Sequence, residues 1–282
     1  WWLSSCYKKN QYMKKISKYL KILKCNSCNE GGIEFNGENY KCNKCNTSIK
    51  SIEDKLLFTK NYFDTKNWDN NSKNFQTLNY GKYLINKING PKIKDLPELF
   101  SYGGASINLG SGDNDYDNYL NIDLGNYDNV DIICNLEKLP FKDNSVSLVS
   151  CNSVFEHLKN PTMVMNEVKR ILKPDGYFYL CVPFMCIRHH EIDYRRWTSF
   201  GLKKFLEDDF EVVETGACRS PVQSLISYVT AFFDLTIKNK IIKKTIFFLW
   251  KYLSAPLYLI KTENSEHTLS LAQTIYVICK KK

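Results

Sequence analysis

The 282-residue chain has no uninterrupted apolar run of the roughly 18 residues that a membrane-spanning helix needs. Its longest apolar stretches, 224–237 and 245–260, are flanked or broken by lysines. The first 23 residues also lack the apolar centre and cleavage site of a secretory signal, because lysines are scattered through them. We therefore expect neither a spanning membrane protein nor a secreted one, and we predict a cytoplasmic location.

The sequence also lacks the third glycine of a dinucleotide-binding turn. An apolar strand at 105–109 leads into Gly110-Ser111-Gly112, but Asp115 occupies the sixth position of the motif. Several aspartates crowd this turn and would repel a pyrophosphate. Asp123 ends the next predicted strand, where a carboxylate can bind both hydroxyls of a ribose. The pattern favours a nucleoside ligand without a pyrophosphate. S-adenosylmethionine, which carries an ammonium and a sulfonium, meets that requirement.

The composition describes a globular protein, with 43% hydrophobic and 14% aromatic residues. The net charge of +9 comes mostly from lysine, and it indicates a nucleic-acid partner only weakly, because the base composition of a genome can produce the same bias. Most cysteines outside the paired ones lie singly in apolar runs, which is typical of a reducing compartment.

Two CxxC pairs, Cys25–Cys28 and Cys42–Cys45, are separated by thirteen residues. Two such knuckles can bring four thiolates around one zinc ion. The sequence between them predicts short strands at 33–35 and 40–41 around an Asn-Gly turn. A closed four-cysteine site leaves no open position for catalysis, so we predict a structural zinc ribbon. A redox dithiol is the alternative, but the sequence around these cysteines does not resemble the helix start at which such dithiols usually lie.

Five motifs follow one another in the second third of the chain. They are the glycine turn with Asp123, then 130–141 (VDIICNLEKLPF), 144–150 (NSVSLVS), 155–158 (FEHL) and 167–176 (EVKRILKPDG). Their order, over about 105–215, resembles the class I S-adenosylmethionine-dependent methyltransferases of the type 11 branch. Similar four-cysteine ribbons precede such domains in ribosomal RNA guanine methyltransferases and in methyltransferases found with surface-glycan synthesis enzymes.

We predict an α/β, Rossmann-like doubly wound fold with a mostly parallel seven-stranded sheet and a small N-terminal zinc ribbon. Strands are expected at 105–109, 119–123, 130–134, 146–151, 177–182, 210–217 and 273–279, the last of these inserted antiparallel, and helices near 161–172 and 199–207. Only 113–118 separate the first two strands, which is too short for a regular crossover helix. Ligands of such sheets bind at the carboxyl ends of the strands.

We divide the chain into six parts: a basic N-terminal extension (1–24), the zinc ribbon (25–58), a linker with helical segments (59–104), the methyltransferase core (105–218), an apolar helical insertion or membrane-interface segment (219–272), and the last core strand with a basic tail (273–282).

The resemblance assigns a cofactor-binding role to residues at the strand ends. Glycines 110 and 112 would pass under the methionine part of the cofactor, and Asp123 would bind its ribose, although a turn or cap aspartate is the alternative. Asn135 and Leu136 match the adenine side. The full set is Asn108, Gly110, Ser111, Gly112, Asp123, Leu124, Asn135, Leu136, Asn152 and Ser153. Asn108 stands where the family has an acidic residue for the methionine ammonium, and Asn114 stands at its third glycine. The missing charge would weaken binding by about 1 kcal/mol or more.

Catalysis on an alcohol needs a base in addition to alignment of the methyl group. The resemblance places His157 at the start of the helix after the fourth strand, facing the substrate, and its near-neutral titration suits that role. A helix-capping or buried structural histidine is the alternative.

A polar cluster follows the fifth strand, where the substrate lid of this fold lies. It resembles a His-x-x-Asp-Tyr-x-Arg-x-Thr pattern of the glycan-associated branch. The predicted substrate-binding residues are His189, His190, Asp193, Tyr194 and Arg196. A solvated loop is the alternative, and Thr198 is typical of a helix N-cap.

The apolar segment 224–260 allows two interpretations. It forms an interfacial helix pair whose lysines meet anionic lipid headgroups, or a helical insertion packed over the active site. The first interpretation adds peripheral contact with the inner face of the membrane to the cytoplasmic location.

Together these features predict an S-adenosylmethionine-dependent methyltransferase that methylates an oxygen of a sugar or lipid-linked glycan intermediate in polysaccharide biosynthesis. An RNA base methyltransferase, with the ribbon and the lysines holding RNA, is one alternative. A degenerate cofactor-binding protein without catalysis is the other, motivated by Asn108 and Asn114.

Overall fold

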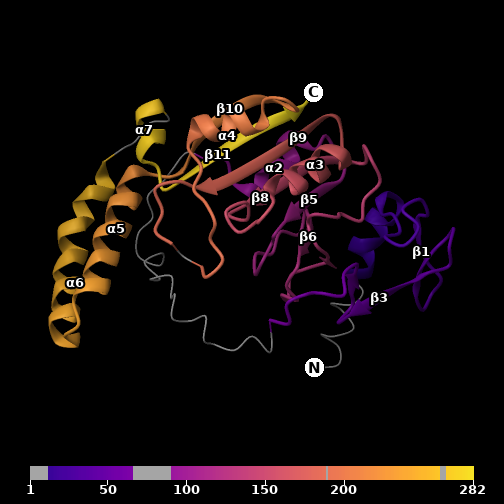
Figure 1. Ribbon diagram of the computed structural model, residues 1–282, viewed down its shortest axis with the longest axis horizontal. Coiled ribbons are helices and arrows are strands. Elements are labelled where there is room, and N and C mark those ends of the chain that lie inside the picture. The colour runs from indigo at the N-terminus through magenta and orange to yellow at the C-terminus, as the bar shows by residue number, and fades with distance from the viewer. Residues whose placement is uncertain (1–11, 66–89, 189, 261–264) are drawn as a thin grey trace.

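The computed structural model describes residues 12–65, 90–188, 190–260 and 265–282 (Figure 1). A single mixed sheet of eleven strands runs through the molecule in the order β1-β2-β3-β4-β7-β6-β5-β8-β9-β11-β10. The strands are β1 (Ile33–Phe35), β2 (Tyr40–Cys42), β3 (Ser48–Ile52), β4 (Lys55–Leu57), β5 (Ser106–Leu109), β6 (Leu120–Asp123), β7 (Ile132–Ile133), β8 (Val146–Asn152), β9 (Leu172–Pro183), β10 (Phe210–Arg219) and β11 (Thr274–Lys281).

The central strands β7, β6, β5, β8 and β9 are parallel, as predicted. β11 lies antiparallel between β9 and β10, which confirms the inserted last strand. Every residue of β5 is buried, because a parallel strand is covered on both faces. The glycine turn and the other predicted cofactor residues that follow these strands therefore gather at one edge of the sheet.

The helices that pack on the core show the expected apolar spacing. α3 (Pro161–Ile171) starts with Pro161 at a position that needs no backbone N–H, and it buries Val164, Val168 and Ile171. α4 (Ser199–Leu206) begins after Thr198, whose hydroxyl accepts a hydrogen bond from the Gly201 N–H and so confirms the predicted cap. The remaining short elements before the core are η1 (Leu20–Ile22), η4 (Ile93–Asp95) and α2 (Leu96–Phe100).

No helix connects β5 and β6, in agreement with the short linking segment. A helix at 12–19 instead packs against this part of the sheet. The hydroxyl of Tyr19 donates to the Ser106 carbonyl of β5 at 3.3 Å, and that of Tyr12 donates to the Asp131 carbonyl before β7 at 3.0 Å. Ile16 between them is fully buried. Residues 12–24, predicted as part of a basic extension, thus belong to the core.

The ribbon strands join the core sheet, whereas the sequence predicted a separate module beside a seven-stranded sheet. β4 pairs in parallel with β7 through Leu56 and Ile132, and the Phe58 N–H donates to the Ile133 carbonyl. The buried Asp131 adds an ion pair of 2.7 Å with Lys15. The sheet therefore has eleven strands, because the ribbon supplies four at one edge.

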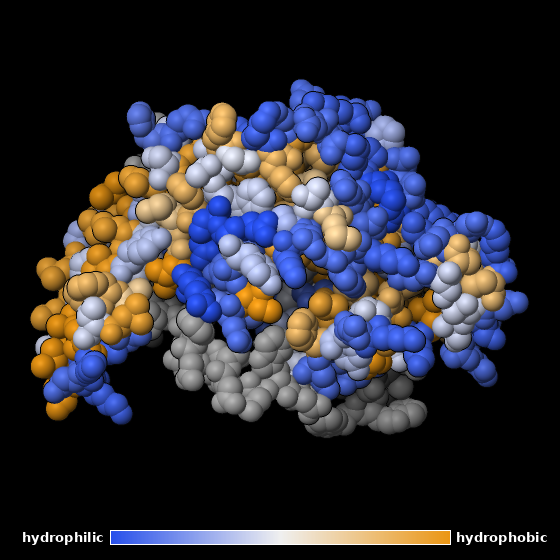
Figure 2. Space-filling model, viewed as in Figure 1, coloured by the Kyte–Doolittle hydropathy of each residue, from blue (hydrophilic) through white to orange (hydrophobic). Residues whose placement is uncertain are grey.

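The C-terminal apolar segment forms a helical hairpin. It comprises α5 (Pro221–Thr236), α6 (Lys240–Ser254) and η5 (Ala255–Leu259), and α7 (Glu266–Leu271) leads back to β11. The hairpin extends beyond the sheet at one side of the molecule (Figure 1), and many of its apolar side chains are exposed (Figure 2). Whether the segment covers the active site or meets a membrane stays a prediction, and the exposed apolar side chains favour the second interpretation. Among the described residues, no helix has the length and apolar character needed to cross a membrane.

Candidate functional site

The glycine turn after β5 has the backbone geometry that its sequence predicts. Gly110 and Gly112 both have positive φ angles, 66° and 53°, which residues other than glycine rarely adopt. A Cβ on Gly110 would lie 2.2 Å from Val154 Cγ2, so this glycine also permits close packing. A Cβ on Gly112 would meet nothing within 4 Å, so the backbone there faces open space that a ligand can enter.

Asp123 at the end of β6 is bound to this turn. Its carboxylate accepts hydrogen bonds from the Gly112 N–H at 2.9 Å and the Gly125 N–H at 2.8 Å. Burial raises the pKa of Asp123 above its ordinary value, and these backbone donors oppose that rise. Each carboxylate oxygen can accept a further hydrogen bond, so Asp123 can both brace the turn and bind a diol.

The turn also carries a polar group that a ligand could satisfy. The Ser111 side chain is 1% exposed, and its hydroxyl has no hydrogen-bond partner among the described residues. Buried hydroxyls are usually paired. The open space at Gly112, the unpaired Ser111 hydroxyl and the carboxylate of Asp123 fit S-adenosylmethionine at this turn.

The other predicted cofactor residues differ in their surroundings. Asn108 is 3% exposed, and its amide lies 3.5 Å from the Asn121 side chain inside the sheet. Leu124 follows Asp123 and accepts a backbone hydrogen bond from Phe63. Asn135 is exposed and its side chain caps the Glu137 N–H, whereas Leu136 is buried. The structure thus brings the glycine turn, Asp123 and Leu124 together, and it places Asn108 behind them in the sheet.

Asn152 and Ser153, at the end of β8, line a cavity of about 400 Å³ at the carboxyl edge. Ser153 has a positive φ of 56° and donates its N–H to the Cys181 carbonyl at 2.9 Å. The other lining residues are Pro91, Lys92, Ile93, Lys94, Tyr116, Tyr179, Cys181, Cys218, Arg219 and Thr274. These residues were not among the predicted site residues, although Cys181, Cys218 and Arg219 stand near the ends of predicted strands, which is the signal that could have indicated them.

Two of the missed residues are thiols in contact. Cys181 Sγ donates to Cys218 Sγ at 3.0 Å, and the Tyr179 hydroxyl lies 3.3 Å from the same Cys218 sulfur. The hydrogen bond from Cys181 lowers the pKa of Cys218, against the effect of burial. The cavity therefore contains a thiol with increased thiolate character.

His157 lies outside this cavity, in a turn that precedes α3. The helix begins only at Pro161, so the prediction that His157 starts it is wrong. Its Nδ1 contacts the Ile192 carbonyl, and its Nε2 lies 3.6 Å from a carboxylate oxygen of Glu156. The His190 ring meets the His157 ring edge-on with centroids 5.2 Å apart. The structure therefore brings the predicted base and the lid together.

Two of the predicted substrate residues hold the lid in shape. Arg196 forms a two-pronged ion pair with Asp193 and donates to the carbonyls of Cys186 and Ile187. The Asp193 side chain is only 1% exposed, while Tyr194 is exposed. Substrate contact through Asp193 and Arg196 stays a prediction, and their visible contacts brace the loop. His189 lies outside the described residues.

The four paired cysteines converge in the ribbon. Their sulfur atoms all lie within 4.8 Å of one another, with 3.7 Å between Cys25 and Cys45 and 3.6 Å between Cys28 and Cys42. Four thiolates at the Zn–S length of a tetrahedral site are about 3.8 Å apart. Thr47, 3.0 Å from Cys45 Sγ, lowers the pKa of that thiol to about 6.

The ribbon backbone adds support for a metal. N–H groups point at the sulfurs, for example from Gly31 to Cys28 at 3.3 Å and from Lys44 to Cys42 at 3.4 Å. A Cβ on Gly31 would lie 2.2 Å from Cys42 Sγ. The donor set and its spacing fit a four-coordinate zinc ion.

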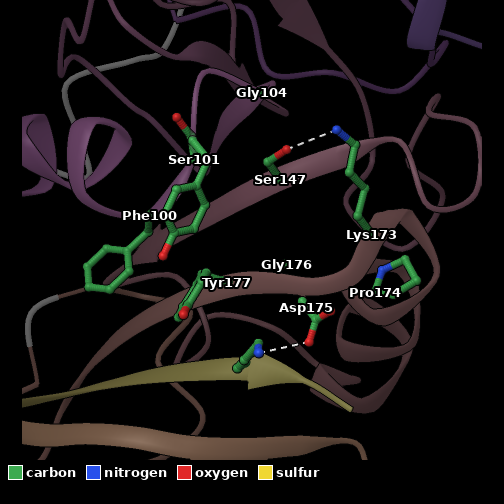
Figure 3. A pocket seen from close by; sticks show the side chains of 11 residues that line it. Phe100, Ser101, Gly104, Ser147, Lys173, Pro174, Asp175, Gly176 and Tyr177 are labelled. Atoms are coloured by element: carbon green, nitrogen blue, oxygen red, sulfur yellow. Dashed lines mark hydrogen bonds and ion pairs between the residues drawn. The ribbon is translucent and has the colours of Figure 1, made fainter.

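A second hollow of about 390 Å³ lies at the opposite edge, where β8 and β9 begin (Figure 3). Lys173 reaches across it to the Ser147 hydroxyl at 3.1 Å, and Lys280 pairs with Asp175 at 2.8 Å. It contains none of the predicted site residues, and both of its lysines are engaged. We assign it no part in the chemistry.

Comparison with known proteins agrees with the motif order. Residues 116–180 match the model of a family described as a methyltransferase domain, Methyltransf_11. An uncharacterised methyltransferase of Schizosaccharomyces pombe is 45% identical over 40 residues, which is 14% of this chain and 14% of that protein. An uncharacterised protein of Methanocaldococcus jannaschii is 45% identical over 51 residues, 18% of this chain and 22% of that protein. The chain thus matches less than a quarter of either relative's length. Residues 116–180 thus match a methyltransferase domain, in agreement with the predicted enzyme class.

Two of the solved structures with a similar arrangement are described as methyltransferases. One from Aquifex aeolicus is described as dependent on SAM (S-adenosylmethionine); it has a TM-score of 0.34 and 18% identity, and the match covers 44% of this chain and 86% of that one. A geranyl diphosphate C-methyltransferase of Streptomyces coelicolor, solved with S-adenosyl-L-homocysteine, has a TM-score of 0.41 and 11% identity, with 67% and 77% covered.

Proposed function

We propose that the protein is an S-adenosylmethionine-dependent methyltransferase that methylates an oxygen of a sugar or lipid-linked glycan intermediate. The observation that carries the proposal is the Gly112–Asp123 hydrogen bond beside open space, at the same sheet edge as the cavity lined by Asn152 and Ser153. In a sheet of this kind the carboxyl edge is where ligands bind.

The chain's own residues bind and orient the reactants. S-adenosylmethionine, when bound, supplies an electrophilic methyl group. Asp123 would hold its ribose, the backbone at Gly112 would lie against the methionine part, and the Ser111 hydroxyl would gain a partner. Because displacement at the methyl group needs an in-line approach, fixing the donor on a rigid turn lowers the barrier by alignment.

His157 would take the proton of the acceptor hydroxyl. With Nδ1 donating to the Ile192 carbonyl, Nε2 is the nitrogen that can accept a proton. Glu156, 3.6 Å from Nε2, would balance the positive charge that forms on the ring. The lid contact through His190 would keep the ring in this orientation.

The cavity, which His157 does not line, would hold the part of the acceptor away from its reacting hydroxyl, and its lining supports an acceptor that carries negative charge. Lys92, Lys94 and Arg219 lie on its lining, and Tyr116 and Tyr179 add aromatic surface on which a sugar ring can stack. A sugar linked to a lipid or carrier through phosphate has both features.

We further propose that the four cysteines hold a structural zinc ion. A closed set of four thiolates stabilises the ribbon and leaves no position for a substrate. Through β4 and its pairing with β7, the ion would stabilise an edge of the core sheet as well.

The test is transfer of labelled methyl from S-adenosylmethionine to a lipid-linked glycan fraction, with cellular RNA as the competing acceptor. His157→Ala should bind S-adenosylmethionine as wild type does, yet lose transfer by about 10²-fold or more. His267→Ala, an exposed histidine on α7, is the matched control and should keep full transfer. Methylation of RNA, together with RNA affinity that falls steeply with salt, would favour the RNA alternative. Binding of the cofactor without transfer to any acceptor would favour the degenerate protein.

A further inference from the structure

The α5–α6 hairpin is a well-defined structure with its own internal contacts. The Asn239 side chain caps α6 by accepting from the Ile241 and Ile242 N–H groups. Trp250 Nε1 donates to the Thr230 hydroxyl at 3.0 Å across the two helices. Lys243 and Asp234 form an ion pair of 3.0 Å close to the bend. The two helices are thus fixed to each other through polar and aromatic contacts on their facing sides.

The outward sides of both helices are apolar. On α5 the exposed residues are spaced three or four apart, which places them on one stripe: Leu225, Tyr228, Phe232 and Leu235. On α6 the exposed apolar residues also share one broad face: Ile241, Ile242, Phe248, Leu249, Tyr252 and Leu253. Leu235 is 81% exposed and Ile241 79%. Figure 2 shows these helices as the most apolar part of the visible surface.

Such a surface is unusual for a protein that stays in water. Exposed apolar residues scattered singly are normal, but a contiguous patch marks a binding surface. Here the exposed apolar residues of α6 share one broad face, so they form a patch and not isolated positions, and α5 carries a second stripe on its own outward side.

Lysines border this patch on a defined side. At 100° per residue, Lys240, Lys244 and Lys251 fall on one flank of α6, between the face packed on α5 and the apolar face. Segment 221–254 contains five lysines and one acidic residue, Asp234. An apolar face with a lysine flank is the pattern of a helix that lies in the interface of an anionic bilayer.

We infer that the α5–α6 hairpin docks on the surface of an anionic lipid bilayer, with the apolar face of α6 in the acyl boundary and the lysines of its flank at the headgroups. The charge also argues against a second copy as the occupant, since two apposed hairpins would bring their lysines together. The inference stands independently of the proposed methyl transfer, because vesicle binding requires neither cofactor nor acceptor.

Docking there would bring the cavity close to the membrane. α5 starts at Pro221, two residues after Arg219, which lines the cavity. An acceptor anchored in the bilayer could then present its headgroup to the cavity while its lipid stays in place.

The test is flotation of the full chain with vesicles of phosphatidylcholine alone or with about one third phosphatidylglycerol. We expect binding to the anionic vesicles that exceeds binding to the neutral ones by about tenfold or more and weakens with added salt. The double variant Phe248→Ser/Leu253→Ser should lower binding by about tenfold or more, because each removes a large apolar side chain from the buried face. The double variant Lys244→Glu/Lys251→Glu should remove the preference for anionic lipid.

Matched controls carry the same changes elsewhere on the surface. Phe200→Ser/Leu99→Ser alters exposed apolar residues on α4 and α2, and Lys41→Glu/Lys50→Glu alters exposed lysines of the ribbon. Both should bind vesicles as wild type does. Circular dichroism and melting temperature establish that each variant is folded.

Three results would overturn the inference. The first is wild type that fails to float with anionic vesicles. The second is equal loss of binding in hairpin and control variants. The third is a wild-type protein that sediments as a dimer and does not bind vesicles, while Phe248→Ser/Leu253→Ser sediments as a monomer. A second copy of the chain would then cover the apolar face.

Discussion

The carboxylate of Asp123 accepts a hydrogen bond of 2.9 Å from the Gly112 N–H, which ties the end of β6 to the turn after β5. One side chain thereby fixes the shape of the turn and stands where a ribose would bind. The same contact explains why an aspartate is useful at this position before any ligand arrives.

Replacing Asp123 by Ala should reduce affinity for S-adenosylmethionine by about tenfold or more, since it removes both a charged acceptor for the ribose and the brace on the turn. Isothermal titration calorimetry measures the affinity. Asp117→Ala, an exposed aspartate of the neighbouring loop, should bind as wild type does. Unchanged binding by Asp123→Ala would refute the placement of the cofactor.

Comparing Gly112→Ala with Gly103→Ala should distinguish the effect of backbone strain on stability from the effect of a filled ligand site on cofactor binding. Both glycines have positive φ, 53° and 76°, and a Cβ at either meets nothing within 4 Å. Each variant should therefore lose a similar stability of about 1 kcal/mol in chemical unfolding. Only Gly112→Ala should weaken cofactor binding strongly, because its methyl group fills the space meant for the ligand. Equal binding by the two variants would count against a site at this turn.

Removal of zinc should destabilise more than the ribbon. Cys25→Ser should lower the zinc content of the purified protein from about one equivalent toward zero and lower its melting temperature, because thiolate ligation stabilises a fold too small to be stable alone. Hydrogen exchange should rise in 25–58 and at β7, to which β4 is paired. Cys186→Ser, a cysteine outside the cluster, is the control and should retain zinc.

Alkaline pH should weaken the packing of the helix at 12–19, because Tyr19 is buried there in its neutral form. Burial, with a contribution from Asp131, raises the pKa of Tyr19 to about 12 from its ordinary 10.0. Because the folded pKa is the higher one, the neutral phenol favours the folded state: this contribution is fully present below pH 10 and is lost as pH rises toward 12. Wild type should lose about 1 kcal/mol more stability than Tyr19→Phe between pH 8 and 11.

Denaturant unfolding of both proteins at several pH values measures this difference. The comparison cancels the titration of lysines, which the two proteins share. Parallel loss of stability in both proteins would show that Tyr19 is not protected by the fold.

Much of the core could be predicted because its signals are local. The apolar runs before Gly110 and Asp123 are strands because they are buried on both faces, and buried strands read as continuous apolar segments. The cap at Thr198 and the start of α3 at Pro161 follow from side-chain and backbone hydrogen-bonding capacity alone.

The site could be predicted only in part, because it combines segments far apart in the chain. Cys181 and Cys218 come from β9 and β10, which follow each other in the chain but are separated in the sheet by β11, so their contact depends on how these three strands pack. The bracing of Asp193 by Arg196 likewise depends on how the loop folds back on the carbonyls of 186–187. No local pattern encodes the contact between the two cysteines or the hydrogen bonds of Arg196 to residues 186–187.

The sequence by itself determined the strands, the glycine turn with Asp123 and the four-cysteine spacing, since each rests on neighbouring residues and on backbone conformation. Only the tertiary structure decided that β4 pairs with β7 and makes the ribbon part of the sheet. It also decided that the α5–α6 hairpin leaves its apolar side exposed. Both are outcomes of long-range packing, in which the position of one element depends on surfaces that distant parts of the chain supply.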